Sequence, residues 1–98
     1  MILQRVILQA KWGRGDELVR LIKKARVEST SFGGRNSRLL TDLSGPFFTI
    51  VTETEFKSLA DFEENRKTLF SQPDVQEFIN ATTPLIESGR QEFFTIED

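Results

Sequence analysis

The chain has 98 residues, 29% of them charged, and a formal net charge of −2, which suits one globular domain over residues 1–98. It contains no Cys, His or Tyr, so disulfides, thiolate nucleophiles, imidazole catalysis and His-ligated haem or zinc are excluded. We therefore expect no cofactor and no metal. The acidic balance also gives no general attraction to nucleic acid or to an anionic membrane surface.

No apolar run approaches the roughly 20 residues that a membrane-spanning helix needs. The first residues, MILQRVILQAKW, include an early Arg and Gln interruptions and have the pattern of a strand instead of a signal peptide. The sequence therefore predicts a cytoplasmic protein with no membrane partner.

The first two predicted elements are a strand and an amphipathic helix. Residues 2–9 carry apolar side chains on both faces of the strand, which indicates that both faces are at least partly covered. Gly13 and Gly15 end this strand, and a helix then runs from Gly15 or Asp16 to about Glu28. Its apolar stripe at helical spacing consists of Leu18, Leu21, Ile22 and Ala25. The basic residues on its other faces are typical of a solvated helix surface.

A hairpin follows a connection rich in small and polar residues. Residues 29–37 (STSFGGRNS) have the composition of a flexible loop. Residues 38–43 then form the predicted third element, a strand, and Ser44-Gly45-Pro46 supplies the turn into a partner strand at 47–55. Neither face of this partner strand is wholly polar.

The last third of the chain predicts two helices and a closing strand. Ser58, with Asp61 three residues later, resembles a capping box at the start of a helix that continues to Phe70. The predicted buried stripe of this helix is Leu59, Phe62, Leu69 and Phe70. Pro73 begins another helix, which Thr83-Pro84 either kinks or restarts and which Gly89 ends. Residues 90–96 form the final strand.

This order predicts a ferredoxin-like β-α-β-β-α-β fold of the α+β class, with an extra helix in the second crossover. Right-handed crossovers give a four-stranded antiparallel sheet with the helices on one face. The other face would expose apolar residues in a monomer, and such patches mark interfaces. We therefore expect a homodimer in which two copies oppose their open sheet faces.

The second half of the chain also resembles a known family. The hairpin LLTDLSGPFFTIVTETEF and the stretch SLADFEENRKTLFSQPDVQEFINATTPLIESGRQEFFTIE are similar to the dimeric α+β barrel superfamily, most of all to small NIPSNAP-like and antibiotic-biosynthesis-monooxygenase-like proteins. The resemblance implies the fold and the dimer. It leaves activity open, because the superfamily includes cofactor-free monooxygenases, haem degraders, isomerases and ligand sensors.

Four residues are candidates for ligand binding, each beside a structural alternative. Trp12 would stack on a planar ligand or pack at the entry to the first helix. Arg66 would bind an anion between helix and sheet, or form an ion pair with Glu53, Glu55 or Glu63 over Phe62. Arg38 is either a pocket residue or the cross-strand partner of Glu53. Asn65 completes the set. The monooxygenases that this chain resembles use Asn, Trp and Tyr around the pocket, and here Tyr is absent.

Two classes of function follow. In the first, the protein is a dimer that binds a small aromatic or anionic molecule between sheet and helices, with residues 29–37 as a lid; a cofactor-independent monooxygenase-like enzyme belongs to this class. In the second, it is a scaffold or interaction module whose interior is filled by its nine Phe side chains. An open cavity with a convergent Arg and amide favours the first class, and a gap packed with Phe favours the second.

Overall fold

A computed structural model describes residues 1–28 and 34–98 of the chain. In these residues a four-stranded sheet is combined with three α-helices, and the strand order is β2-β3-β1-β4. The elements are β1 (Ile2–Ala10), α1 (Gly15–Glu28), β2 (Arg35–Thr41), β3 (Thr49–Phe56), α2 (Leu59–Phe70), α3 (Pro73–Thr82), the 3₁₀ turn η1 (Thr83–Leu85) and β4 (Ile86–Thr95). All neighbouring strands are antiparallel. The predicted ferredoxin-like α+β fold is confirmed.

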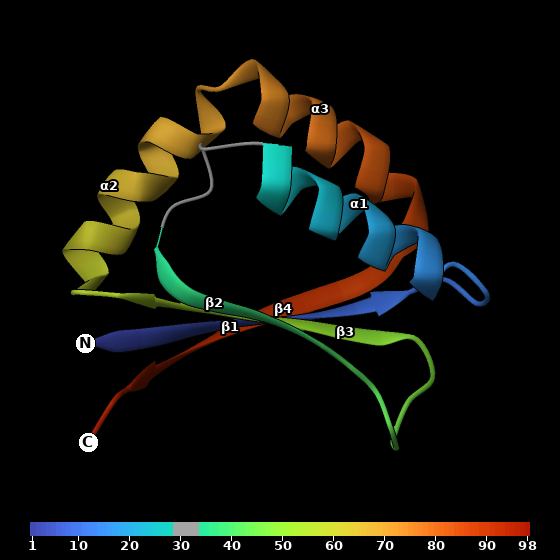
Figure 1. The fold of residues 1–98 in the computed structure, drawn as a ribbon, viewed down its shortest axis with the longest axis horizontal. Helices are drawn as coiled ribbons and strands as arrows, with labels where there is room; N and C mark the ends of the chain where they lie inside the picture. Colours follow the sequence, from blue (N-terminus) through green and yellow to red (C-terminus); the bar gives the residue numbers. More distant parts are fainter. Residues whose placement is uncertain (29–33) are drawn as a thin grey trace.

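The three helices lie on one face of the sheet, above it in Figure 1, and the other face carries no element of the described chain. We call the helix-bearing face the inner face and the bare face the outer face. Because side chains alternate along a strand, even-numbered residues of β1 point inward and odd-numbered residues point outward. Ala10 is buried beneath the helices, and this fixes the assignment.

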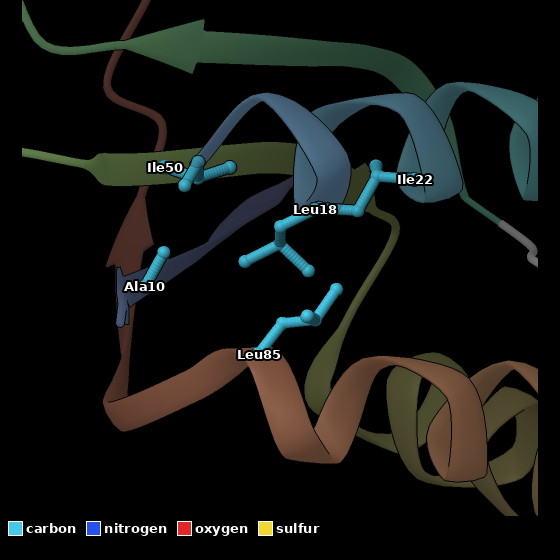
Figure 2. Close-up of a cluster of buried hydrophobic side chains, with 5 residues drawn as sticks. All are labelled: Ala10, Leu18, Ile22, Ile50 and Leu85. Atoms are coloured by element: carbon cyan, nitrogen blue, oxygen red, sulfur yellow. The ribbon is translucent and has the colours of Figure 1, made fainter. Parts of the chain in front are cut away.

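The hydrophobic core occupies only one half of the inner face. Figure 2 shows its five fully buried members converging from β1, α1, β3 and η1, and they are Ala10, Leu18, Ile22, Ile50 and Leu85. Leu18 and Ile22 belong to the predicted stripe of α1, which runs over Gly15–Glu28 as expected. This packing joins α1 and the end of α3 to the sheet.

Several strand boundaries differ from the prediction, and the largest differences are at the starts of β2 and β4. β2 begins at Arg35 instead of residue 38. β4 begins at Ile86, so Gly89 lies inside the strand and does not end a helix. Gly89 is opposite Leu8 in β1, and a Cβ atom on it would stand 3.0 Å from Leu8 Cδ2. The glycine is therefore explained by the close approach of a neighbouring side chain.

The predicted buried stripe of α2 is wrong. None of the residues of α2 is buried, and Phe70 is 53% exposed. Helix α2 is attached near its start, where the ring of Phe62 makes T-shaped contacts with Phe56 (5.4 Å between centroids) and Phe93 (4.9 Å). The rest of the helix stands away from the sheet.

The connections around α2 and α3 agree with the predicted signals. The Ser58 hydroxyl accepts a hydrogen bond from the backbone N–H of Asp61 at 3.1 Å, as an N-cap does. Pro73 occupies the first turn of α3, and Thr83-Pro84 restart the chain as the short turn η1. In the described ranges 1–28 and 34–98, no helix combines the length and apolar character needed to cross a bilayer.

Candidate ligand-binding cavity

A cavity of about 610 Å³ lies between the inner face of the sheet and the helices, and residues of α1, α2 and α3 line it. This volume falls within the range of roughly 300–1,000 Å³ that is typical of small-molecule sites. The described residues that line it are Gln4, Val6, Leu8, Ile22, Ala25, Arg26, Gly34, Ser37, Thr52, Thr54, Phe56, Phe62, Asn65, Arg66, Leu69, Phe70, Phe78 and Gln91.

The cavity exists because the inner face changes character along the strands. At the core end it presents Leu8, Ala10 and Ile50, which pack against α1 and η1. Between this end and Phe56, which packs against Phe62, most side chains of the inner face are hydroxyls and amides that offer a helix little apolar surface to bury: Gln4, Ser37, Thr52, Thr54 and Gln91. The polar half of the inner face is therefore left as the floor of the cavity.

The floor is organised by two polar contacts. Gln4 Nε2 donates a hydrogen bond to Gln91 Oε1 at 3.2 Å, which joins β1 to β4. The hydroxyls of Ser37 and Thr54 are 3.4 Å apart and join β2 to β3. Hydrogen-bonding groups from all four strands thus face the same space.

Two arginines give the cavity a positive charge. Arg26 Nη2 donates to the backbone carbonyl of Ser37 at 2.8 Å, and the Arg66 guanidinium lies 5.8 Å from the centroid of the Phe70 ring. Among residues 1–28 and 34–98, no carboxylate forms an ion pair with either arginine, and the described lining contains no Asp or Glu. Residues 29–33 have the sequence STSFG, which contains no ionisable side chain.

A smaller hollow of about 330 Å³ adjoins the cavity and differs in charge. It shares Gly34, Phe56 and Asn65 with the cavity, but Arg35 and Lys57 are accompanied there by three acids, Glu55, Asp61 and Glu64. The charges in this hollow oppose each other, so the larger cavity is the better anion site. In the described ranges, no group of three or more Asp or Glu residues is arranged to hold a metal ion.

The comparisons with known proteins identify the fold. No family model and no curated protein matches the sequence. A solved NIPSNAP family protein from Agrobacterium tumefaciens is 22% identical, with a TM-score of 0.87, and the match covers 99% of this chain and 93% of that one. An uncharacterised NIPSNAP domain protein from Burkholderia xenovorans is 18% identical, with a TM-score of 0.81 over 98% and 94% of the two chains.

The chain has the fold of NIPSNAP proteins. A proposed antibiotic biosynthesis monooxygenase from Chloroflexus aurantiacus also matches, at 20% identity and a TM-score of 0.71 over 100% of this chain and 97% of that one. The predicted resemblance to both groups is confirmed at the level of fold. At these identities the likeness does not extend to an activity, and several of the matched proteins are themselves uncharacterised.

Within this NIPSNAP-like fold, the four predicted ligand-binding residues are divided between two places. Asn65 and Arg66 line the cavity. Trp12 is 76% exposed beyond the end of β1, where its ring packs edge-on against Phe47 and Phe48. Arg38 pairs with Glu53 across β2 and β3. A ligand-binding role for these residues stays a prediction.

The ion pair of Glu53 belongs to the outer face. Glu53 is only 3% exposed and accepts hydrogen bonds from Arg38 and, at 2.9 Å, from Arg5 Nε. Burial opposes ionisation, but the hydrogen bonds and positive charges of Arg5 and Arg38 outweigh it and hold the pKa of Glu53 below its ordinary value of 4.5. Arg38 is therefore occupied by this carboxylate.

The sequence did not predict three of the cavity residues, Arg26, Gln4 and Gln91. Gln4 carried a signal, because it interrupts the apolar residues that share its face of the first strand. Arg26 lies one position beyond the apolar stripe of α1 and has no such signal. The predicted lid at residues 29–37 falls partly outside the described residues; of its described part, Gly34 and Ser37 line the cavity.

Proposed function

We propose that this protein binds a small organic anion with an apolar, aromatic body in the cavity between sheet and helices, and that it does so as a homodimer. The observation that carries the proposal is the pair Arg26 and Arg66, which face an open cavity without a carboxylate partner among the described residues. We further propose that residues 1–98 act as one domain in the cytoplasm.

The positive charge argues for an anion. Both arginines are exposed to solvent, and neither is matched by an acid in the described residues, although the chain has 15 acids against 13 basic residues. None of these acids lines the cavity, and Glu55, Asp61 and Glu64 line the adjoining hollow instead. The planar guanidinium groups of Arg26 and Arg66 suit a carboxylate, which accepts two parallel hydrogen bonds from one arginine.

The other walls argue for an apolar ring. Phe62, Leu69 and Phe70 from α2 and Phe78 from α3 line the cavity opposite the polar floor. Aromatic side chains favour edge-on or offset contact with another ring. Among the described residues, the space between these rings and the floor is open, which disfavours the predicted alternative of an interior filled by Phe. The amide of Asn65 lies one residue before Arg66 and offers a further polar contact.

The outer face supports the dimer. Its apolar residues come from all four strands and surround the Arg5–Glu53–Arg38 cluster; they are Leu3, Ile7, Leu40, Val51 and Phe94. Leu40 is 41% exposed and Phe94 44% exposed, while no helix of the described chain covers them. Opposing two such faces would remove this apolar surface from water.

A thermal-shift screen tests the ligand proposal. Wild-type protein is heated with benzoate, phenylpropanoate and naphthoate, and with the methyl ester of each acid. We expect at least one acid at a saturating concentration to raise the Tm by about 4 °C or more while its ester does not. Arg66→Gln should abolish the shift, and Lys67→Gln, which removes the same charge from the adjacent position outside the cavity lining, should retain it.

Two results would contradict the proposal: esters that stabilise as well as acids, or an acid response that survives in Arg66→Gln to the same extent as in Lys67→Gln. Oxygen uptake is then measured in the presence of an acid that binds. This measurement decides whether the ligand is also a substrate, which is worth testing because a monooxygenase-like neighbour has the same fold.

A further inference from the structure

We propose that the paired amides of Gln4 and Gln91 select, among the acids that enter the cavity, those carrying a hydroxyl group at the end opposite the carboxylate. This inference rests on the proposed function. It specifies a second polar group of the ligand, a hydroxyl, beside the carboxylate. It is carried by the Gln4–Gln91 contact on the cavity floor and by its separation from Arg26, which is bonded to β2.

The amide pair offers complementary free groups. One N–H···O bond of 3.2 Å links Gln4 to Gln91, and it engages one amino group and one carbonyl oxygen. The other carbonyl oxygen and the other amino group have no partner in the described residues. A hydroxyl both donates and accepts one hydrogen bond, so it can satisfy both groups together. An ether, a halogen or a second carboxylate cannot.

The amide pair is accessible on the floor of the cavity. Gln4 shares the inner face of β1 with Val6 and Leu8 and is half-buried, and Gln91 is exposed. The hydrogen bond between the two amides is itself exposed, and both residues line the cavity. Their free groups are therefore available to a ligand hydroxyl, which would take the place of water.

The sheet sets the distance between the two ends of the ligand. Arg26 is bonded to the Ser37 carbonyl on β2, and the amide pair bridges β1 and β4. β2 and β4 are the two edge strands of the order β2-β3-β1-β4, so their backbones are about 14 Å apart at three strand spacings. Inward-pointing side chains shorten this span. The geometry fits one ring that carries an acid chain on one side and a hydroxyl on the opposite side.

The inference is tested by calorimetric titration with matched pairs of ligands. Phenylpropanoate and para-hydroxyphenylpropanoate are titrated into wild type, Gln4→Leu, Gln91→Leu and the control Gln76→Leu, whose side chain lies on α3 outside the cavity lining. For wild type and Gln76→Leu, we expect the hydroxylated acid to bind about tenfold more tightly than the parent acid. In Gln4→Leu and Gln91→Leu this ratio should fall to about one, whatever the affinity of the variant for the parent acid.

The informative quantity is the ratio of the two acids' affinities within each variant, because a general loss of structure would weaken the binding of both acids together. Equal binding of both acids to the wild type, or a tenfold preference that persists in Gln4→Leu and Gln91→Leu, would overturn the selection by the amide pair. If the amide pair proves not to select the hydroxyl but acid binding still depends on Arg66, the proposed function stands. If neither acid binds to the wild type, and none of the screened acids does, the proposed function fails and this inference fails with it.

Discussion

At the scale of single residues, the two faces of the sheet use arginine in opposite ways. On the outer face Arg5 and Arg38 converge on the buried carboxylate of Glu53. On the inner face Arg66 lies against the ring of Phe70 and has no ion-pair partner in the described residues. The first arrangement stabilises the fold, and the second leaves a cation available to a ligand.

The Glu53 cluster predicts a specific pH dependence of stability. Because the pKa of Glu53 is lower in the folded state, the unfolded state binds more protons between the two pKa values. The contribution of Glu53 is therefore present above the ordinary value of 4.5 and is lost as the pH falls through the folded pKa. Glu53→Gln should lower the free energy of unfolding by about 1.5–3 kcal/mol at neutral pH.

The measurement is urea unfolding across this acidic range in wild type, Glu53→Gln and the exposed control Glu77→Gln. The acid-induced loss of stability should be smaller in Glu53→Gln, because the substituted amide does not titrate, and unchanged in Glu77→Gln. Parallel pH profiles for all three proteins would show that Glu53 does not supply this dependence.

At the scale of elements, α2 determines whether a cavity exists. It is held by its N-cap and by Phe62, and none of its residues is buried. Its start was predictable, because Ser58 and Asp61 lie at the spacing of a cap. Its distance from the sheet was not, because the period of apolar residues indicates which side of a helix faces inward but not how closely it packs.

The N-cap should therefore control the local stability of α2. Ser58→Ala removes the hydrogen bond to the Asp61 amide and should destabilise the helix by about 1 kcal/mol. Amides of α2 should then exchange with solvent about fivefold faster, whereas those of α1 keep their rates. The control is Ser44→Ala in the β2–β3 turn. Equal acceleration in α1 and α2 would mean that the cap acts on the whole fold and not on α2.

The sequence also could not show where the nine Phe side chains lie. A filled interior was one of the two predicted alternatives, yet Phe47, Phe70 and Phe94 are exposed in the described chain. Side chains with identical chemistry cover the outer face, the hairpin and the cavity wall. The core residues Leu18 and Ile22 were predictable because they repeat at helical spacing, but the cavity depends on contacts between elements that are distant in the chain.

At the scale of the whole molecule, the proposed dimer covers the outer face with a second copy of the chain. We predict that Leu40→Glu converts the dimer to a monomer, because it places a charge in the apolar surface that two copies would bury together. The control is Val27→Glu, since Val27 is 86% exposed on α1, away from the sheet. Size-exclusion chromatography with light scattering measures the mass, and a monomeric wild type at micromolar concentration would contradict the dimer.

NMR locates a bound acid and so shows whether it occupies the cavity between sheet and helices. A two-dimensional ¹H–¹⁵N NMR spectrum of the labelled protein is recorded while an acid that passes the thermal-shift screen is titrated in. We predict that the largest shifts belong to residues lining the cavity, among them Gln4, Asn65 and Arg66, while the Trp12 indole and the amide of Arg38 stay in place. Shifts that centre on Trp12 or Arg38, with Asn65 and Arg66 unmoved, would contradict the account.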